Sequence, residues 1–453
     1  MDYLPHTEAD RAAMLAAIGV ARLENLFADL PSRLRFPDLA LPAGVTELEL
    51  EALLRRRAAA NVATDAASCF LGAGAYNHWS PPTVDYVLQR GELYTAYTPY
   101  QPEISQGNLQ AMFEYQTMIC RLTGMEVSNA SHYDGATALA EAVLLALDQT
   151  QAHGRGARDR VLVSSGVHPQ YREVLRTYLR GTDATVVGDD VDLELPALAE
   201  RLDTSTAALV IQNPNFLGQF ETVAGLADAA HRAGALLIVV ADPIALGRFT
   251  PPGAYGADVV VAEGQALGIP LSFGGPHLGI FATKLAHVRR LAGRLVGETV
   301  DADGARGYVL TLATREQHIR RAKATSNICT NAALVALGTA VYLATMGRSG
   351  LREVAELCWQ RSHYAARAIA RLPGVRVNPQ APAKPFFKEF VVALPKSVAA
   401  VNAILRDDFG IVGGYDLGQA LPGRERDMLV AVTEMNDRAA IDRLVAGLAK
   451  AIA

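Results

Sequence analysis

Cysteine is scarce in this sequence, and the four cysteines stand far apart. Cys69, Cys120, Cys329 and Cys358 form no CxxC pair, and their apolar neighbours are typical of buried, reduced thiols. We therefore expect a reducing compartment, namely the cytoplasm.

Positive charge is not in excess. Lys and Arg number 42 against 47 Asp and Glu, which gives a formal net charge of −5. Such a balance provides no general attraction to phosphate backbones, so we expect no nucleic acid partner. We interpret the basic triplet Arg55–Arg57 as a solvated helix face.

Signals for export, membrane insertion and several common chemistries are also lacking. The first residues are acidic where a secretory signal is positive, and the longest nearly uncharged stretch, Ala332–Gly347, is shorter than the roughly 20 residues of a membrane span. We interpret this stretch as a helix buried between domains. There is no GxSxG, Walker or GxGxxG motif, and His168, His277 and His318 lack a ligand spacing, so no metal site is predicted.

The 453 residues suffice for two or three domains at about 150 residues each. Residues 1–60 predict a helical arm that begins at a Thr7 cap with Glu8 and Asp10 in the first turn. Residues 61–330 predict a large α/β domain. Residues 331–453 predict a connecting helix and a small α+β domain, read as strand, helix, strand, helix.

Continuous apolar runs in the large domain are typical of parallel strands with helices on both faces. The expected strands lie near Val161, Val186, Val210, Ile238 and Val260.

Two features in this domain are candidate ligand sites. Ser131, Gly135 and Thr137 stand at the start of an alanine-rich helix, where free N–H groups and the helix dipole can bind a phosphate, although a capped helix without ligand has the same sequence. Asp242 ends a buried strand, where its carboxylate can hold a protonated ring nitrogen of a cofactor or cap the next helix.

The stretch "VVVAEGQALGIPLSFGGPH", residues 259–277, raises a question about chemistry. A buried strand opens into a glycine-rich loop, the place where a pyridoxal enzyme carries its Schiff-base lysine. The loop contains no lysine: its candidate groups are the amide of Gln265 and the hydroxyl of Ser272.

A tyrosine-rich segment, residues 91–110, is too proline-broken for a regular helix. Stiff aromatic residues with polar tips favour a pocket lining or an interface, against a plain surface loop packed on the core. Further along, Arg320, Arg321 and Lys323 precede a polar turn, where they can hold a carboxylate or form ordinary helix-surface charge.

Together these segments resemble the glycine decarboxylase P-protein family of the glycine cleavage system, in the form that is split into two chains. The matching stretches run in family order across nearly the whole chain: "TAYTPYQPEISQG", "YQTMICRLTGMEVSNASHYDGATALAEA", "QNPNFLG", "ADPIALG", "PPGAYGAD", "GIPLSFGGPH" and "RRAKATSNICTN". His132 departs from the pattern, because an apolar residue is expected there.

The resemblance implies the fold type I, aspartate aminotransferase-like architecture of pyridoxal enzymes, with a mostly parallel seven-stranded sheet. It also implies that Gln265 stands where the catalytic chain has its lysine, so that pyridoxal phosphate is held covalently by the second subunit. The sites at Ser131, Gly135, Thr137 and Asp242 would then be vestigial or empty.

The implied reaction is decarboxylation of glycine on pyridoxal phosphate, with transfer of the aminomethyl group to the lipoyl group of H-protein. The implied assembly is a heterotetramer with two copies of each chain. We expect this chain to line the partner's site with the following residues: Tyr94, Thr95, Tyr97, Thr98, Tyr100, Gln101, Glu103, Arg320 and Asn327.

Two alternatives stay open at this point. One is a self-sufficient pyridoxal enzyme that uses another lysine, such as Lys284 or Lys323. The other is a non-catalytic partner that only stabilises or regulates the second subunit.

Overall fold

The computed structural model describes residues 5–64, 66–151, 158–190 and 194–453. The chain divides into two units, Met1–Val62 and Ala63–Ala453.

The first unit consists of short helices joined by coil. These are α1 (Glu8–Ile18), η1 (Leu23–Phe27), η2 (Ser32–Leu34) and α2 (Glu47–Ala58). The predicted Thr7 cap is confirmed, because its hydroxyl accepts the Asp10 N–H and Asp10 returns a bond to the Thr7 backbone. The Arg55–Arg57 triplet is exposed on α2, as predicted. None of these four elements buries a side chain, so local capping rather than a core defines them.

The second unit is built on a seven-stranded sheet in the order β2-β8-β7-β6-β5-β3-β4. Neighbours from β7 to β4 run parallel, whereas β8 is antiparallel to both β7 and β2. All five predicted strands are confirmed. The strands are β2 (Val127–Ser128), β3 (Arg160–Val163), β4 (Thr185–Val187), β5 (Thr206–Asn213), β6 (Leu236–Ala241), β7 (Val259–Glu263) and β8 (Gly279–Thr283).

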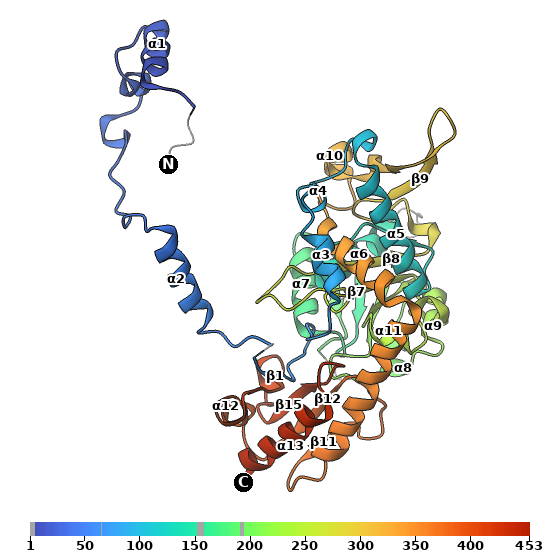
Figure 1. The fold of residues 1–453 in the computed structure, drawn as a ribbon. Helices are drawn as coiled ribbons and strands as arrows, with labels where there is room; N and C mark the ends of the chain where they lie inside the picture. Colours follow the sequence, from blue (N-terminus) through green and yellow to red (C-terminus); the bar gives the residue numbers. More distant parts are fainter. Residues whose placement is uncertain (1–4, 65, 152–157, 191–193) are drawn as a thin grey trace. The chain divides into compact units, whose positions relative to one another are not determined.

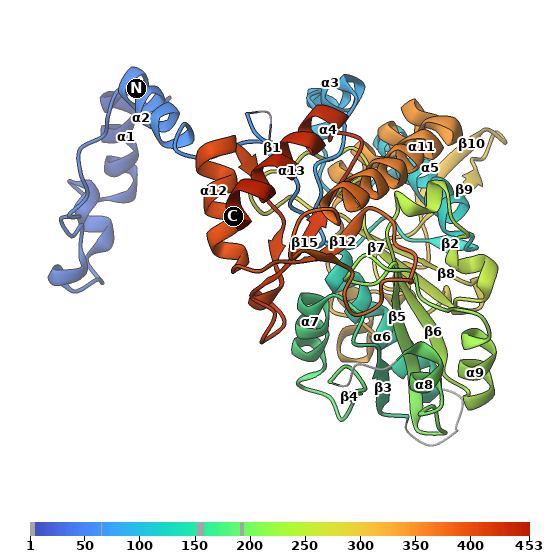
Figure 2. The ribbon, with the colours of Figure 1, turned by 90° about the horizontal axis from the view of Figure 1, so that it is seen from below.

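Both faces of this sheet are buried, which explains the uninterrupted apolar runs (Figure 2). Leu209 and Val239 point into a cluster shared with α5 and α11, while Val210 and Val240 point into a cluster shared with α6. Alternate residues of one strand thus pack on opposite helical layers. The helices of the large domain are α3 (Pro82–Leu88), α4 (Gly91–Tyr94), α5 (Gln106–Thr123), α6 (Gly135–Gln151), α7 (Pro169–Leu179), α8 (Leu195–Ala199), α9 (Leu226–Ala233) and α10 (Gln317–Arg320).

The predicted connecting helix is longer and less buried than expected. Helix α11 spans Ala333–Ile369, with a break at Gly347, where φ is 61° (Figure 1). By length and composition it could cross a membrane, yet only 39% of its most apolar window is buried. The predicted helix is therefore present, but it continues past Gly347 to Ile369 and is only partly buried where it packs on α3 and α5.

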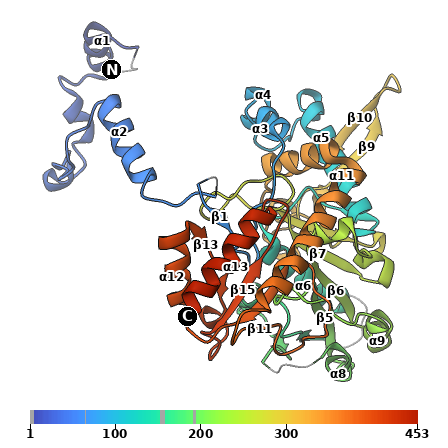
Figure 3. The same cartoon turned by 60° about the horizontal axis from the view of Figure 1, so that its bottom comes forward.

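The small domain follows the predicted strand, helix, strand, helix order (Figure 3). Strands β12 (Glu389–Ala393) and β15 (Asp427–Ala431) pair antiparallel, and β11 (Arg376–Val377) and β14 (Tyr415–Asp416) complete the sheet. Helices α12 (Val398–Phe409) and α13 (Arg438–Ile452) cover one side. Sequence patterns also missed the β9–β10 hairpin (Val296–Val300 and Arg306–Leu310) and the short pair β1 (Ser68–Cys69) and β13 (Ile411–Val412).

The cysteines are free, and two of them differ from the sequence expectation. Cys69 and Cys358 are buried as predicted, but Cys120 is half-buried and Cys329 is exposed. Cys329 lies in an irregular segment before α11, where its apolar neighbours do not enclose it.

Candidate functional site

A small pocket lies where β5, β6 and β7 end and the small domain begins. Its open volume is about 50 Å³, room for a few water molecules. Ligand pockets for small organic molecules are usually several hundred Å³. The lining includes Gly74, Tyr76, His168, Tyr171, Asp242, Glu263, Phe387, Lys388 and Glu389.

Lys388 fills the part of the pocket next to Asp242. Its ammonium lies 2.8 Å from Asp242 Oδ2 and 3.6 Å from the centre of the Tyr76 ring. The Lys388 side chain is 2% exposed. The other carboxylate oxygen of Asp242 accepts the Ile244 N–H at 2.9 Å, so Asp242 both caps the following turn and binds a cation. Here the cation is a residue of the chain itself.

A buried network extends from Lys388 into the small domain. Lys388 Nζ lies 3.1 Å from His78 Nε2, and His78 Nδ1 lies 2.7 Å from Glu434 Oε2. Because an ammonium can only donate, Nε2 must accept and Nδ1 carries the proton. Burial and the Lys388 charge lower the pKa of His78, so its ring is neutral at pH 7.

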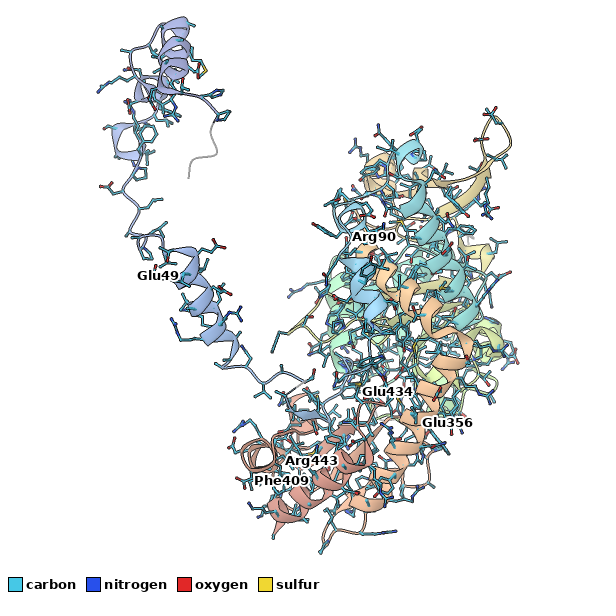
Figure 4. The ribbon with its side chains drawn as sticks, viewed as in Figure 1. Glu49, Arg90, Glu356, Phe409, Glu434 and Arg443 are labelled. Carbon is cyan, nitrogen blue, oxygen red and sulfur yellow. The ribbon has the colours of Figure 1, made fainter. Side chains whose placement is uncertain are left out.

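Glu434, which is labelled in Figure 4, is the ionised end of this network. Burial alone would raise its pKa, but the attraction of the His78 ring, once that ring is protonated at low pH, its hydrogen bond and the Trp79 N–H hold the pKa of Glu434 at about 2. The Cys358 thiol joins at 3.5 Å, and burial raises its pKa well above the usual value. His78, Cys358 and Glu434 have the donor types of a zinc site, with ligand atoms within 4.8 Å of one another. No metal ligand was predicted at these three positions.

Gln265 turns away from the pocket and ties two backbone segments together. Its amide nitrogen donates to the carbonyls of Tyr76 at 3.0 Å and Ile269 at 2.6 Å, and its Oε1 accepts the Tyr76 N–H at 3.0 Å. The residue is 2% exposed. At this position an amide serves as a structural bridge, because both its donors and its acceptor are used.

The start of α6 is already occupied by an anion from the chain. The Gly135 N–H donates to Glu263 Oε2 at 3.0 Å, while Glu263 Oε1 accepts the N–H groups of Gln265 and Leu278. A Cβ at Gly135 would meet the Tyr171 hydroxyl at 2.2 Å, so only glycine fits. Glu263 and Tyr171 thus occupy the place predicted for a phosphate.

The other predicted phosphate contacts are used internally. Ser131 is fully buried and its hydroxyl accepts the Ala332 N–H at 3.0 Å. Thr137 lies inside the first turn of α6, and its N–H and hydroxyl both donate to Asp134. His132, the departure from the family pattern, is fully buried against Phe281, and neither ring nitrogen has a partner in the described part of the chain.

The tyrosine-rich segment is exposed to solvent, unlike the buried residues of the pocket. The side chains of Tyr94, Tyr97 and Tyr100 are 55%, 73% and 59% exposed. Thr95, Gln101 and Glu103 are exposed as well, and Thr98 is half-buried. The segment is less irregular than predicted: α4 and the turn η3 (Pro102–Ile104) interrupt it, and its last residues, 106–110, form the first part of helix α5.

Arg294 anchors the tyrosine-rich segment to the irregular segment that precedes α11. It is a buried residue that pairs with Glu316, donates to the Tyr100 hydroxyl at 3.1 Å and donates to the Cys329 carbonyl at 2.7 Å. Arg320 and Asn327, on the second segment, are exposed. In Figure 1, α4 and α10 are drawn at the same end of the second unit.

The lysines that the sequence offered as substitutes lie elsewhere. Lys284 pairs with Asp258 at 2.6 Å, and Lys323 is exposed in the turn η8 (Arg321–Lys323). The lysine in the pocket is Lys388, which sequence reasoning missed. A lysine directly before the apolar strand "EFVVAL" was the available signal.

The architecture is that of the fold type I pyridoxal-phosphate enzymes, since similar solved structures include the sphingosine-1-phosphate lyase of Burkholderia pseudomallei and the glutamate decarboxylase of Lactobacillus brevis. The match to the lyase covers 93% of this chain and 94% of the lyase chain, with a TM-score of 0.65 and 17% identity. The match to the glutamate decarboxylase covers 93% of this chain and 95% of the decarboxylase chain, with a TM-score of 0.67 and 15% identity.

The model of the glycine cleavage system P-protein family matches residues 1–448, and the chain belongs to that family. It is 52% identical to a probable glycine dehydrogenase (decarboxylating) subunit 1 of Thermomicrobium roseum over the whole of both chains. It is 50% identical to the protein of the same name in Desulforamulus reducens, over 99% of each. A crystal structure of glycine decarboxylase (P-protein) of the glycine cleavage system, in inhibitor-bound form, covers 100% of both chains with a TM-score of 0.89 and 49% identity.

The residues of this pocket do not fit pyridoxal phosphate. An internal lysine takes the carboxylate that would hold the ring nitrogen, Glu263 takes the Gly135 N–H at the start of α6, and Gln265 cannot form a Schiff base. This pocket therefore supports no chemical step on that coenzyme.

Proposed function

We propose that this chain is the first subunit of a two-chain glycine dehydrogenase (decarboxylating) and that it holds no coenzyme itself. The second subunit carries pyridoxal phosphate, glycine loses its carboxyl group there, and the aminomethyl group passes to the lipoyl group of H-protein. The assembly is a heterotetramer with two copies of each chain, in the cytoplasm.

One observation carries this proposal: the Gln265 amide bridges Tyr76 and Ile269 at the position where a lysine would hold the coenzyme. A side chain whose hydrogen bonds are all used inside the fold is a stable structural replacement rather than a damaged catalytic one. The names of the similar chains, which read subunit 1, support a second chain as the place of the chemistry.

The role of this chain toward its partner follows from the exposed face that carries Tyr94, Tyr97 and Tyr100. Large rings with a polar tip are enriched at interfaces, where they bury apolar area and keep a hydrogen bond. The remaining residues of the proposed lining are Thr95, Thr98, Gln101, Glu103, Arg320 and Asn327.

The test is glycine–bicarbonate exchange by the reconstituted pair. The Tyr97→Phe/Tyr100→Phe variant is expected to lose at least about tenfold in rate, because two lost hydrogen bonds of about 1 kcal/mol each correspond to a factor of that size. The matched control is Tyr178→Phe, on α7 and 37% exposed, which is expected to retain the rate. Equal rates in the double variant and the control would refute a role in lining the partner's site.

If this chain were a self-sufficient pyridoxal enzyme, Lys388 would be the candidate for its Schiff-base lysine, because this lysine lines the pocket. If it held the coenzyme, the isolated chain would acquire visible absorbance with pyridoxal phosphate, and borohydride would fix the label on Lys388. We expect no stoichiometric label, because Lys388 is committed to Asp242 and His78. The regulatory alternative is tested by the second subunit alone: full-rate decarboxylation without this chain would favour it.

A further inference from the structure

We propose that Lys388 is a built-in replacement for the coenzyme, and that its ammonium clamps the small domain onto the large domain through Asp242. The proposal rests on the proposed function in one respect only, that this chain holds no coenzyme. It adds a positioning residue that neither the family match nor the sequence pattern assigns.

Lys388 is chemically equivalent to the group that the coenzyme would present to Asp242. In pyridoxal enzymes a carboxylate at this sheet edge pairs with the protonated ring nitrogen. Asp242 ends β6 and presents Oδ2 to a cation 2.8 Å away. Lys388 therefore supplies the positive N–H donor that the coenzyme would otherwise supply.

The buried charges of Lys388 and Asp242 also depend on each other electrostatically. Both members of the pair are largely removed from water, with exposed side-chain fractions of 2% for Lys388 and 15% for Asp242. A buried charge that loses its partner is strongly destabilising, whereas replacement of both charges by neutral groups is often neutral. The two groups thus depend on each other in the folded chain.

The Lys388–Asp242 pair also joins the small domain to the large domain. Lys388 directly precedes β12 of the small domain, and Asp242 directly follows β6 of the large domain. Near this pair the backbones also touch: the Phe387 N–H donates to the Gly218 carbonyl at 3.0 Å. A Cβ at Gly218 would lie 2.1 Å from the Glu389 carbonyl oxygen, so glycine permits this close approach.

The segment 70–79 is held by both domains around the same lysine. Its Tyr76 backbone bonds to Gln265, while the Ala73 N–H donates to Glu389 Oε1 at 2.7 Å and the Trp79 N–H donates to Glu434 Oε1 at 2.6 Å. The Tyr76 ring lies under the Lys388 ammonium, and His78 accepts from it. The Lys388 clamp therefore holds the large domain, the small domain and the segment 70–79 together through groups of the chain itself.

The experiment is hydrogen exchange, read by mass spectrometry, on the full chain and three variants: Lys388→Met, Asp242→Asn and the double variant. Each single variant leaves one buried charge unpaired, so we expect exchange in residues 70–79 and 386–394 to speed up by at least about tenfold. In the double variant, which has no unpaired charge, we expect rates closer to those of the unaltered chain than in either single variant.

The matched control is the exposed pair Lys450 and Asp408, whose Nζ and Oδ2 atoms are also 2.8 Å apart, with side chains 62% and 44% exposed. Its three corresponding variants are expected to exchange within about twofold of the unaltered chain. The Asp242→Asn variant keeps an oxygen for the Ile244 N–H, so it gives the decisive comparison if Lys388→Met does not fold.

Unchanged exchange in Asp242→Asn would overturn the clamp, as would single effects that simply multiply in the double variant. These outcomes are separate from a failure of the proposed function. A chain that bound pyridoxal phosphate, or a pair inactive on glycine, would contradict the proposed function while the exchange cycle still reported the coupling.

Discussion

The interdomain pocket and the tyrosine-rich face differ in how their polar groups are satisfied. In the pocket, Gln265, Glu263 and Lys388 bind other groups of the same chain. On the outer face, Tyr94 and Tyr97 present more than half of their surface to solvent. The polar groups of the pocket are thus satisfied within the chain, whereas the face that we propose to contact the partner is open to solvent.

The largest expected effect comes from the buried anchor of the outer face. Arg294→Met leaves Glu316, whose side chain is 5% exposed, without its cation, and it frees the Tyr100 hydroxyl. We expect a loss of about 3–5 kcal/mol in the free energy of unfolding, measured in urea. The control Arg406→Met breaks an exposed pair and is expected to leave the free energy of unfolding unchanged within the error of the measurement. An Arg294 variant as stable as this control would contradict the anchor.

Removing the Gln265 bridge tests the inner side of the comparison. Gln265→Leu keeps the approximate shape but leaves the Tyr76 N–H and the carbonyls of Tyr76 and Ile269 without that partner. Unpaired buried groups cost about 1–3 kcal/mol each, so we expect a loss of about 3 kcal/mol in urea unfolding.

Gln110→Leu is the matched control, because Gln110 is exposed and its amide bonds only to Glu114 nearby. We expect it to change the free energy of unfolding by less than about 0.5 kcal/mol. Equal stabilities of the two variants would mean that the bridge contributes nothing to the fold.

Glu389 makes the pocket sensitive to pH. Burial raises the pKa of its carboxyl from the ordinary value of 4.5 to about 7. The folded chain therefore keeps a proton that the unfolded chain releases, and stability falls as pH rises from about 4.5 to about 7. Glu389→Gln is expected to gain on the order of 2–3 kcal/mol relative to the unaltered chain across that window.

The measurement is urea unfolding at several pH values, with the exposed Glu298→Gln as the control. Parallel stability profiles for Glu389→Gln and the unaltered chain would show that the Glu389 carboxyl has the same pKa in both states, against this account.

The smallest expected effect at pH 7 concerns His132, a buried polar ring without partners in the described residues. His132→Leu is expected to stabilise the chain by about 1–2 kcal/mol at pH 7. Burial lowers the pKa of the ring to about 3, so the advantage grows by about 1.4 kcal/mol per pH unit as pH falls below 6.5 toward that value. Thermal melts from pH 4 to pH 8 check this, with the exposed His6→Leu as control; a variant less stable than the unaltered chain would mean that the ring is needed.

Much of the fold was predictable because the signals are local. Apolar runs placed the strands around Val210 and Ile238, and Thr7 marked the start of α1. The end of α11 was missed because Gly347, a typical helix stop, here only interrupts a helix that continues to Ile369.

The candidate site was harder to predict, because its partners come from distant parts of the chain. Asp242 was recognisable at a strand end, but nothing local pairs it with Lys388, which precedes a strand of another domain. The start of α6 carried a phosphate pattern, yet the sequence could not show that Glu263 would accept the Gly135 N–H. Whether the exposed tyrosines line a partner's site stays a prediction.

The most direct test of the central claim is covalent labelling of the purified chain with pyridoxal phosphate and borohydride, followed by peptide mapping and an assay for glycine decarboxylation with and without the second subunit. The account predicts no stoichiometric label on this chain and activity only in the pair. A stoichiometric label on Lys388, together with turnover by the isolated chain, would contradict it.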